Sequence, residues 1–272
     1  MQTREHARWP WLLGAVVLIG AGVWLFRPQG AQAPATVAAK GEAAPTLTNT
    51  PPAPAPAAAP AIAHPIAPDA AADAAIPALG SSDGAVLSAL AGVVGDDGAL
   101  AILLRDHLVQ RLVVMVDNLP QRSIAPRALA YRPLQDTLAT ATGDDQVQVL
   151  DTAANARRYA PFVRAFVQAD ASALAGAYRR FYPLFQQAYV EVGPPQGYFN
   201  DRLVTVIDHL LQTPVPRQPL AVVPGANGKL RFADPSLESL SVGQKAVLRL
   251  APEQAEAVKQ QLRAFRAAIT GA

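Results

Sequence analysis

A tract rich in proline and alanine occupies the first third of this sequence and limits how much of the chain can fold. Residues 28–79 contain eleven prolines, five of them within residues 51–60. Such a composition cannot bury enough apolar surface to offset the entropy of folding, and it favours extended polyproline II. We therefore expect a disordered linker over residues 27–80 and one folded domain over residues 81–272. His64 lies alone in this linker, and we assign it no role.

An apolar segment without charged residues precedes the linker. It covers residues 9–26, and at about 1.5 Å per residue it would span roughly 27 Å, close to the thickness of a bilayer core. Trp9, Trp11 and Trp24 lie near its two ends, where indole rings prefer the headgroup level. We expect residues 9–26 to form a transmembrane helix, preceded by a short tail over residues 1–8.

A cleaved signal peptide is the alternative interpretation of the same segment. Arg4 and Arg8 would form its basic region, and Ala31-Gln32-Ala33 has the small residues of a cleavage site. Pro34 would follow the cut, which is unfavourable for processing, and the apolar run is long for a signal peptide. These features favour a retained anchor.

The orientation of this anchor rests on the short N-terminal tail. Arg4 and Arg8 precede the helix while Arg27 and Lys40 follow it, so the count of positive charges on the two sides is tied. Moving a short tail with two arginines across the membrane is unfavourable, whereas a long following segment crosses largely regardless of its charge. We expect a single-pass protein of the bacterial inner membrane with its C-terminal domain in the periplasm.

Composition excludes several kinds of chemistry. The chain has no cysteine, which excludes disulfides, thiol catalysis and zinc sites built from cysteine. A formal net charge of only +2 gives no reason to expect nucleic-acid binding. His107 and His209 are the only histidines of the predicted domain, so a histidine-rich metal site is impossible. We expect no metal, no cofactor and no assigned catalytic residue.

The predicted domain reads as mainly α-helical, with one or two minor β-hairpins. Apolar residues recur at helical spacing in several segments, and Pro183 should kink or break the helix that contains it. Val147 and Val149 near a Gly-Asp-Asp turn predict one hairpin, and an Asn-Gly turn at residues 227–228 predicts another. The first expected helix starts at Ser81-Ser82-Asp83 and is broken by Gly95. Further helices are expected over about residues 98–118, 155–169, 170–192, 201–212 and 252–269, with short ones after Asp234 and Ser241. The expected N-terminal caps are Asp170 or Ser172, Asn200 and Ser241.

The densest cluster of polar and aromatic side chains predicts a binding groove between two adjacent helices. Arg179, Tyr182 and Gln186 share one side of a helix, and the following turn would bring Asp201 near its end. The groove could accept a sugar, a peptide or a partner helix. The alternative is a helical hairpin whose aromatic residues are core and whose polar groups form caps and ion pairs. The candidate binding residues are Arg179, Tyr182, Gln186, Tyr189, Tyr198, Asn200, Asp201 and Arg202.

Other candidate sites have simpler explanations. Several arginines between residues 157 and 180 could meet an anionic surface such as lipid headgroups, but they are also typical of a solvated face. Asp208 and His209 are adjacent on a helix and point about 100° apart, so they are poorly placed to pair. Glu191 and Asp201 could act as paired carboxylates, as in glycosidases, although the sequence provides no geometry for this.

Several long motifs resemble a bacterial family catalogued as "domain of unknown function 3014", over roughly residues 98–268. The resemblance implies an N-terminal membrane segment, a proline-rich spacer and this domain, in a proteobacterial envelope setting. It implies no activity, because the family has none assigned. The motifs are VVMVDNLP (113–120), NARRYAPFVRAF (155–166), YRRFYPLFQQAY (178–189), GYFNDRL (197–203), IDHLLQTP (207–214) and RFADPSLESLSVGQK (231–245).

Two functions from different classes follow from these observations. The first is a non-enzymatic protein whose tethered domain binds or scaffolds an envelope protein or a cell-wall component. The second is a hydrolase that cleaves cell-wall glycan or peptide with carboxylates. A hydrolase needs a cleft with convergent carboxylates, whereas a binding domain needs an exposed patch or groove.

Overall fold

The computed structural model describes residues 61–66, 76–95, 100–134, 137–225 and 229–271. The predicted transmembrane helix and most of the predicted linker lie outside these residues. Within the described part of the chain, no helix combines the length and the apolar character needed to cross a membrane.

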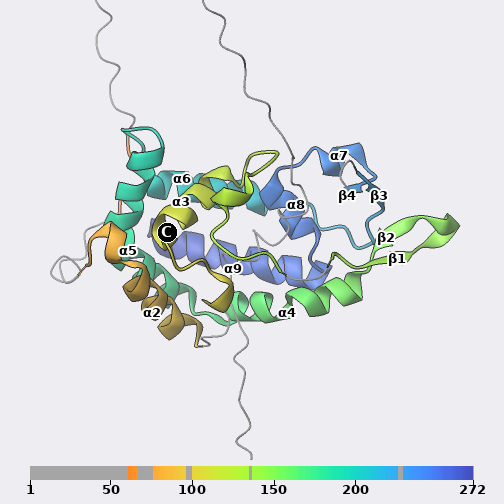
Figure 1. Cartoon of the computed structure of the whole chain (residues 1–272), viewed down its shortest axis with the longest axis horizontal. Helices are drawn as coiled ribbons and strands as arrows, with labels where there is room; N and C mark the ends of the chain where they lie inside the picture. Colours follow the sequence, from red (N-terminus) through yellow and green to blue (C-terminus); the bar gives the residue numbers. More distant parts are fainter. Residues whose placement is uncertain (1–60, 67–75, 96–99, 135–136, 226–228, 272) are drawn as a thin grey trace, which may run out of the picture.

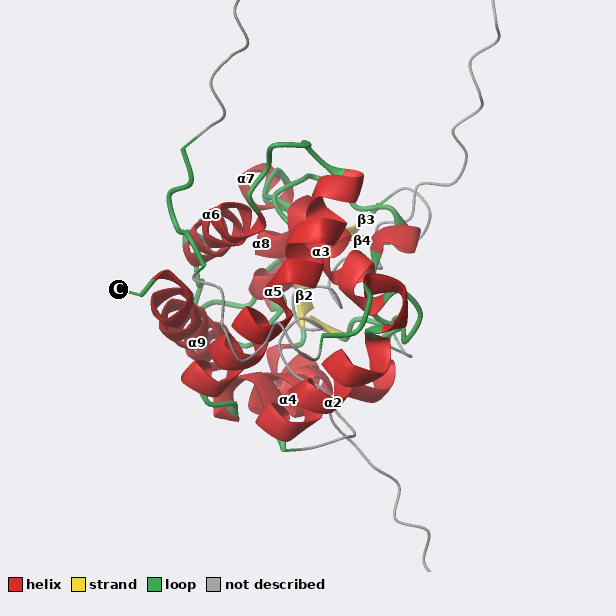
Figure 2. Cartoon of the chain, turned by 90° about the vertical axis from the view of Figure 1, so that its left-hand side faces the viewer, coloured by secondary structure: helices red, strands yellow, loops and turns green. Residues whose placement is uncertain are grey.

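Helices dominate the described residues, and the strands are confined to two short hairpins (Figure 2). The expectation of a mainly α-helical domain is thereby confirmed. The helices are α2 (Asp83–Val94), α3 (Leu108–Asn118), α4 (Thr152–Gln168), α5 (Ala171–Val192), α6 (Phe199–Leu211), α7 (Pro235–Glu238), α8 (Val242–Leu248) and α9 (Pro252–Thr270). Single 3-10 turns are η1 (Leu79–Ser81), η2 (Leu100–Ile102), η3 (Pro126–Ala128) and η4 (Asp144–Gln146).

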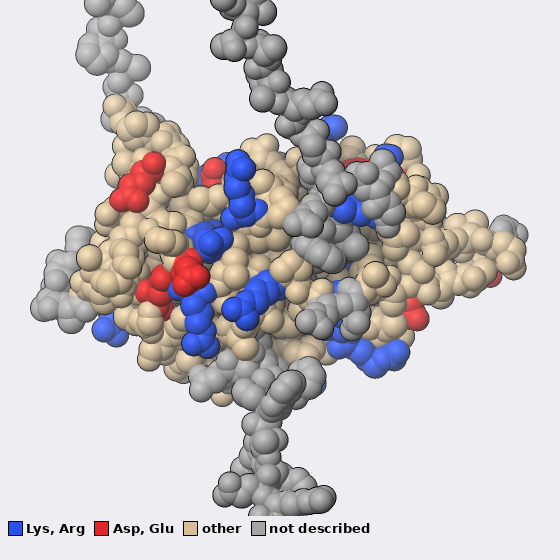
Figure 3. Space-filling view, in the orientation of Figure 1, with Lys and Arg blue, Asp and Glu red and all other residues tan. Residues whose placement is uncertain are grey.

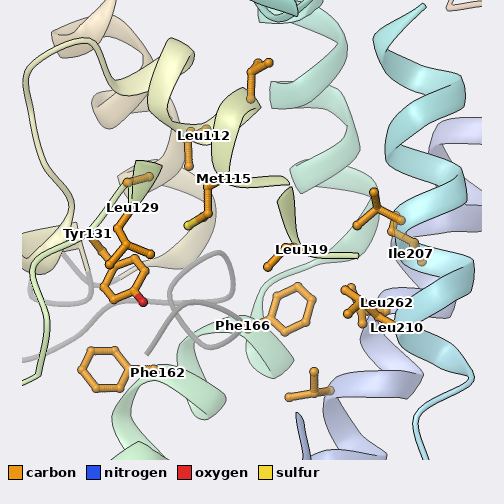
Figure 4. Packing of buried hydrophobic residues seen from close by; sticks show 14 of the residues in the cluster. Leu112, Met115, Leu119, Leu129, Tyr131, Phe162, Phe166, Ile207, Leu210 and Leu262 are labelled. Atoms are coloured by element: carbon orange, nitrogen blue, oxygen red, sulfur yellow. The ribbon is translucent and has the colours of Figure 1, made fainter. Parts of the chain in front are cut away.

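One hydrophobic core joins the long helices. Helix α9 runs along the molecule and packs on α4, α5 and α6, while α2 and α3 pack against α5 (Figure 1). Met115 of α3 and Leu119, which follows the end of α3, point into the interior, as do Phe166 of α4 and Leu262 of α9 (Figure 4). The apolar stripes that predict these helices are therefore the surfaces through which they pack.

Side-chain caps begin several helices where the sequence predicts them. The Asp170 carboxylate accepts a hydrogen bond from the Ala173 N–H at 2.7 Å and caps α5. Ser241 and Gln244 form a reciprocal capping box at the start of α8. Asp170, one of two candidates for its helix, and Ser241 are thereby confirmed as caps, because each satisfies an N–H that has no partner within the helix. The predicted Asn200 cap is wrong, because α6 begins at Phe199, one residue before Asn200.

The predicted start of the helix that contains α3 is wrong. The sequence predicts a helix over residues 98–118, but α3 begins only at Leu108. Leu104 donates its N–H to the Ala130 carbonyl at 2.9 Å, and Leu103 forms an isolated β-bridge with Tyr131. This pairing with a distant segment needs extended backbone, so the preceding residues cannot continue the helix.

Helix α5 continues through Pro183 from Ala171 to Val192, so the predicted local break does not occur. Pro183 lacks the N–H that would bond to the preceding turn, which weakens an isolated helix. Here α5 packs on α3 and α9, and Tyr182 and Leu184 on either side of the proline are buried. Tertiary packing therefore offsets the missing hydrogen bond.

Both predicted hairpins are present. Strand β1 (Thr140–Thr142) pairs with β2 (Gln148–Leu150), and β3 (Val222–Pro224) pairs with β4 (Leu230–Phe232), both antiparallel. The residues of the predicted Asn-Gly turn lie outside the described part of the chain. The Leu150 N–H donates to the Leu220 carbonyl at 2.9 Å and joins the two hairpins, which lie together at one end of the molecule (Figure 1).

Candidate functional site

The turn between α5 and α6 is held by one glutamine of α5. The Gln186 amide donates to the Gly197 carbonyl at 2.8 Å, and its oxygen accepts from the Phe199 N–H at 2.8 Å. The same oxygen also accepts a hydrogen bond from the Tyr182 hydroxyl at 2.9 Å. Gln186 therefore positions the first turn of α6 relative to α5, and with it the polar residues that open α6.

Close packing at this turn requires a glycine. A Cβ atom on Gly197 would lie 2.7 Å from the Tyr189 ring and 2.8 Å from Pro194 Cγ. Real Cβ atoms do not approach carbon atoms so closely, so any larger residue would displace the ring. The Tyr189 ring lies on Phe199, with ring centroids 5.4 Å apart. Gly197 thus allows α5 and the start of α6 to pack through their aromatic residues.

Asn200 lies at the centre of the site and is fully buried. Its side-chain oxygen accepts from the Tyr178 hydroxyl at 3.2 Å. Its side-chain amide donates to the His64 carbonyl at 2.9 Å and more weakly to the Ile269 carbonyl at 3.4 Å. A buried amide needs such partners, because an unsatisfied one costs about 1–3 kcal/mol. Asn200 therefore connects α5, α6 and the end of α9 with a distant part of the chain.

That distant part is the segment of residues 61–66, here called the strap. The Asp201 carboxylate accepts the Ala63 N–H at 2.9 Å on one oxygen and the His64 N–H at 2.7 Å on the other. The Tyr198 hydroxyl accepts the Ile66 N–H at 2.7 Å. The strap lies within the predicted linker, yet its main chain is bound by three of the candidate site residues.

The aromatic residues beneath the site stay uncharged. Burial raises the pKa of the Tyr178 hydroxyl well above its usual value, and burial also raises the pKa of Tyr182. Both hydroxyls therefore keep their protons and remain hydrogen-bond donors at neutral pH. Phe185 and Phe199 stack with ring centroids 5.8 Å apart, which adds a rigid apolar base below the polar groups.

Three of the predicted binding residues contact other parts of the domain. Arg202 binds the Asp117 side chain and the Asp117 carbonyl, each at 2.7 Å, and ties α6 to the end of α3. Arg179 donates to the Ala268 carbonyl at 2.8 Å and ties α5 to α9. Tyr189 is buried against Phe199. The site that the structure brings together consists of Tyr198, Asn200 and Asp201, supported by Tyr182 and Gln186.

The carboxylates considered for hydrolysis each contact a different group. Asp208 forms a two-point ion pair with Arg266, at 2.6 and 2.9 Å. Glu191 accepts from the Gln187 amide at 2.9 Å, and Asp201 binds the strap. Among the described residues, no group of three or more histidine, aspartate or glutamate side chains is placed to hold a metal ion.

The arginines considered for an anionic surface are distributed over two helices. Arg158 of α4 donates to the Thr137 carbonyl at 2.8 Å, and Arg180 of α5 lies 5.3 Å from the centre of the Phe181 ring. On the face shown in Figure 3, basic side chains lie beside acidic ones. This arrangement is typical of a solvated face with local pairing.

A family model described as "Protein of unknown function (DUF3014)" matches residues 108–266. The chain belongs to the DUF3014 family. The match runs from the start of α3 into α9, and it includes Tyr198, Asn200 and Asp201, whereas the strap and α2 precede it. No curated protein and no solved structure matches this chain.

His209 makes the stability of this DUF3014 domain sensitive to pH. Its Nε2 lies 2.9 Å from the Ser241 hydroxyl oxygen, and burial together with the charge of Arg202 lowers its pKa below the usual 6.5. Below about pH 6.5 the unfolded chain takes up a proton that the folded chain resists. The contribution of neutral His209 to the free energy of unfolding is therefore fully present above that pH, and it is lost as the pH decreases toward the lowered pKa.

When the pH is lowered from 7.5 to 5.5, we expect the urea concentration at the unfolding midpoint to decrease more for the wild-type protein than for His209→Gln. The glutamine keeps a polar partner for Ser241 but does not titrate. Equal shifts in the two proteins would show that another group causes the acid sensitivity.

Proposed function

We propose that this DUF3014 protein is a tethered binding protein of the bacterial inner membrane, with a periplasmic domain that binds proline-containing segments of another envelope component. Residues 9–26 would be its anchor, and the proline-rich linker would allow the domain to reach its partner. The observation that carries this proposal is the set of hydrogen bonds from Tyr198, Asn200 and Asp201 to the main chain of the strap.

The chemistry of the site suits a peptide main chain. One carboxylate accepts two consecutive N–H groups, and the buried amide of Asn200 donates to the carbonyl of the second residue. Hydrogen bonds to an ionised carboxylate are stronger than those between neutral groups. Because no strap side chain takes part in these bonds, another segment with a compatible backbone could replace it.

The strap also indicates which segments would fit. Pro65 has no N–H, and it restricts His64 to extended or polyproline conformations. Ile66 packs against the hydrophobic core, whereas Ile62 is half exposed. We infer a ligand with any two residues, then proline, then an aliphatic residue. The restricted backbone lowers the entropy that such a segment loses on binding.

The contacts of the acidic residues favour binding over hydrolysis. A carboxylate that activates water needs a second carboxylate or a base placed across the substrate. Asp201 instead accepts two main-chain N–H groups, and Asp208 is paired with Arg266. These contacts hold a peptide in place without supplying an acid and a base to cleave it.

The strap competes with any partner for the same residues. It is joined to η1 through only residues 67–78, and a segment tethered by so short a stretch of the same chain has a high effective concentration, on the order of millimolar. A partner segment must therefore displace the strap. Weakening the strap should increase binding of a segment supplied by another molecule, which provides a test of the proposal.

The test uses the full chain and a fluorescent peptide with the sequence of residues 59–68. Ala63→Pro removes one N–H donated to Asp201, so we expect this chain to bind the peptide about tenfold more tightly than the wild type. Adding Asp201→Ala to Ala63→Pro should abolish the gain. Asp208→Ala is the matched control, because it removes a carboxylate from the same helix without touching the strap.

A photo-crosslinking residue at Thr205 extends the test to intact cells. Thr205 is exposed on α6, and its hydroxyl donates to the Asp201 carbonyl at 2.8 Å. We expect crosslinks to an envelope protein that increase with Ala63→Pro and disappear with Asp201→Ala. If Ala63→Pro binds no more peptide and gives no more crosslinks than the wild type, the site binds only the strap of its own chain and the proposal is wrong.

A further inference from the structure

A cavity of about 180 Å³ lies inside the helical domain, and Tyr178, Phe185 and Phe199 beneath the polar site form part of its wall. Helices α2, α3, α5, α6 and α9 all contribute to its wall, with Leu90, Met115, Ala177, Val206 and Phe265 as examples. Every lining residue is apolar except Tyr178. The Tyr178 hydroxyl donates to Asn200, so it is not available to a ligand in the cavity.

The size of this cavity is unusual for a protein interior. Interiors are packed like organic crystals, and voids larger than one water molecule are few. An apolar cavity of about 150 Å³ stays dry and binds benzene, because its walls offer water no hydrogen bonds. A space of this size therefore lowers stability unless an apolar molecule fills it.

We propose that the cavity binds a single alkyl chain, from a free fatty acid or from the acyl chain of a lipid. The wall extends across six helices, including α4 through Phe166, and has no charged residue, so an elongated apolar group fits it while a charged headgroup would remain outside. This inference does not rest on peptide binding at Asp201, because the residues that bind the strap, Tyr198, Asn200 and Asp201, do not line the cavity.

Helix α2 is the part of the cavity wall through which an alkyl chain could best enter. Its sequence, DGAVLSALAGVV, is apolar on most sides, yet Val86 is its only fully buried residue. Ala89, Leu90 and Val94 line the cavity and remain partly exposed. A helix that presents apolar side chains both to the cavity and to the surface offers a route by which a chain can enter without crossing a polar layer.

A natural probe of occupancy exists in this chain. The sequence contains two methionines, Met1 and Met115, and the second is fully buried and lines the cavity. In the full chain labelled with 13C at the methionine methyl groups, the Met115 signal reports directly on the cavity. The chain should be held in a lipid-free scaffold of amphipathic peptides, so that no lipid competes with the added ligand.

We expect decanoate, but not acetate, to shift the Met115 methyl signal in a saturable manner. A second titration with a short-chain phosphatidylcholine distinguishes the two sources of the chain. A shift with decanoate alone assigns the cavity to free fatty acids, and a shift with both assigns it to lipid acyl chains as well. Either result supports alkyl binding.

Two substitutions that fill the cavity provide the decisive comparison. Ala177→Phe from α5 and Ala89→Leu from α2 should each reduce the decanoate shift at least tenfold. Ala173→Phe is the matched control, because Ala173 lies one turn earlier on α5 and is exposed. Ala89→Leu is the smaller change and serves if Ala177→Phe does not fold.

Two results would overturn the proposal. The first is a Met115 signal that does not respond to either ligand up to the solubility limit of decanoate. The second is an equal response in the folded filling variants and in Ala173→Phe.

Discussion

Replacing Phe199 with alanine should lower the free energy of unfolding by about 4 kcal/mol, a typical cost of truncating a buried aromatic side chain. Phe199 is 2% exposed. It stacks on Phe185 and contacts Tyr178 and Tyr189, with ring centroids between 5.4 and 6.5 Å away. Urea unfolding followed by circular dichroism measures the change.

The same substitution should also loosen the peptide site. Phe199 is the first residue of α6, and its N–H donates to Gln186 directly before Asn200 and Asp201. Phe199→Leu is the control, because leucine refills much of the space and should cost about half as much. A loss below about 1 kcal/mol for Phe199→Ala would show that the aromatic cluster does not stabilise this end of the domain.

Gly243→Val should destabilise the domain by about 3 kcal/mol, or prevent folding, because α8 approaches α3 and α6 too closely for a side chain. A Cβ atom at this position would lie 2.6 Å from Leu210 Cδ2 and 3.1 Å from the Leu119 carbonyl oxygen. The Gly243 N–H donates to that carbonyl at 3.0 Å, and the Val242 N–H donates to the Gln121 carbonyl at 2.8 Å. These bonds prevent α8 from moving away.

Gly176→Val provides the matched control for this prediction. Gly176 lies inside α5, and no atom outside its own helix backbone lies within 4 Å of a Cβ built there. Valine and glycine differ little in helix propensity, so this change should alter stability by less than about 0.5 kcal/mol. Thermal unfolding of both variants tests the difference. Similar melting temperatures would contradict the close approach of α8.

The predicted parts of the fold depend on signals that lie close together in the sequence. Asp170 caps α5 three residues before the N–H that it binds, and Ser241 and Gln244 form their capping box over the same distance. The hairpin of β1 and β2 surrounds a Gly-Asp-Asp turn. Such contacts can be read from residue type and spacing, because all participants lie within one turn of chain.

The candidate site was predicted only in part. Tyr198, Asn200 and Asp201 are among the eight residues predicted for the groove, and the structure places these three around the strap. The strap itself was not predicted, and its Ala63 binds Asp201 across 138 positions of sequence. The available signal was the pair Ile62 and Ile66, aliphatic residues in a tract of proline and alanine, but nothing in that tract indicates which surface they contact.

The sequence by itself determined which segments are helical, where several of them begin and which residues face the core, because periodicity and capping depend on neighbouring residues. Only the tertiary structure decided that α3 begins at Leu108, that α5 continues through Pro183 and that Arg202 forms an ion pair with Asp117. Each of these outcomes depends on a contact with a distant segment. Their energies belong to pairs of residues that meet only after the chain has folded, so local spacing carries no information about them.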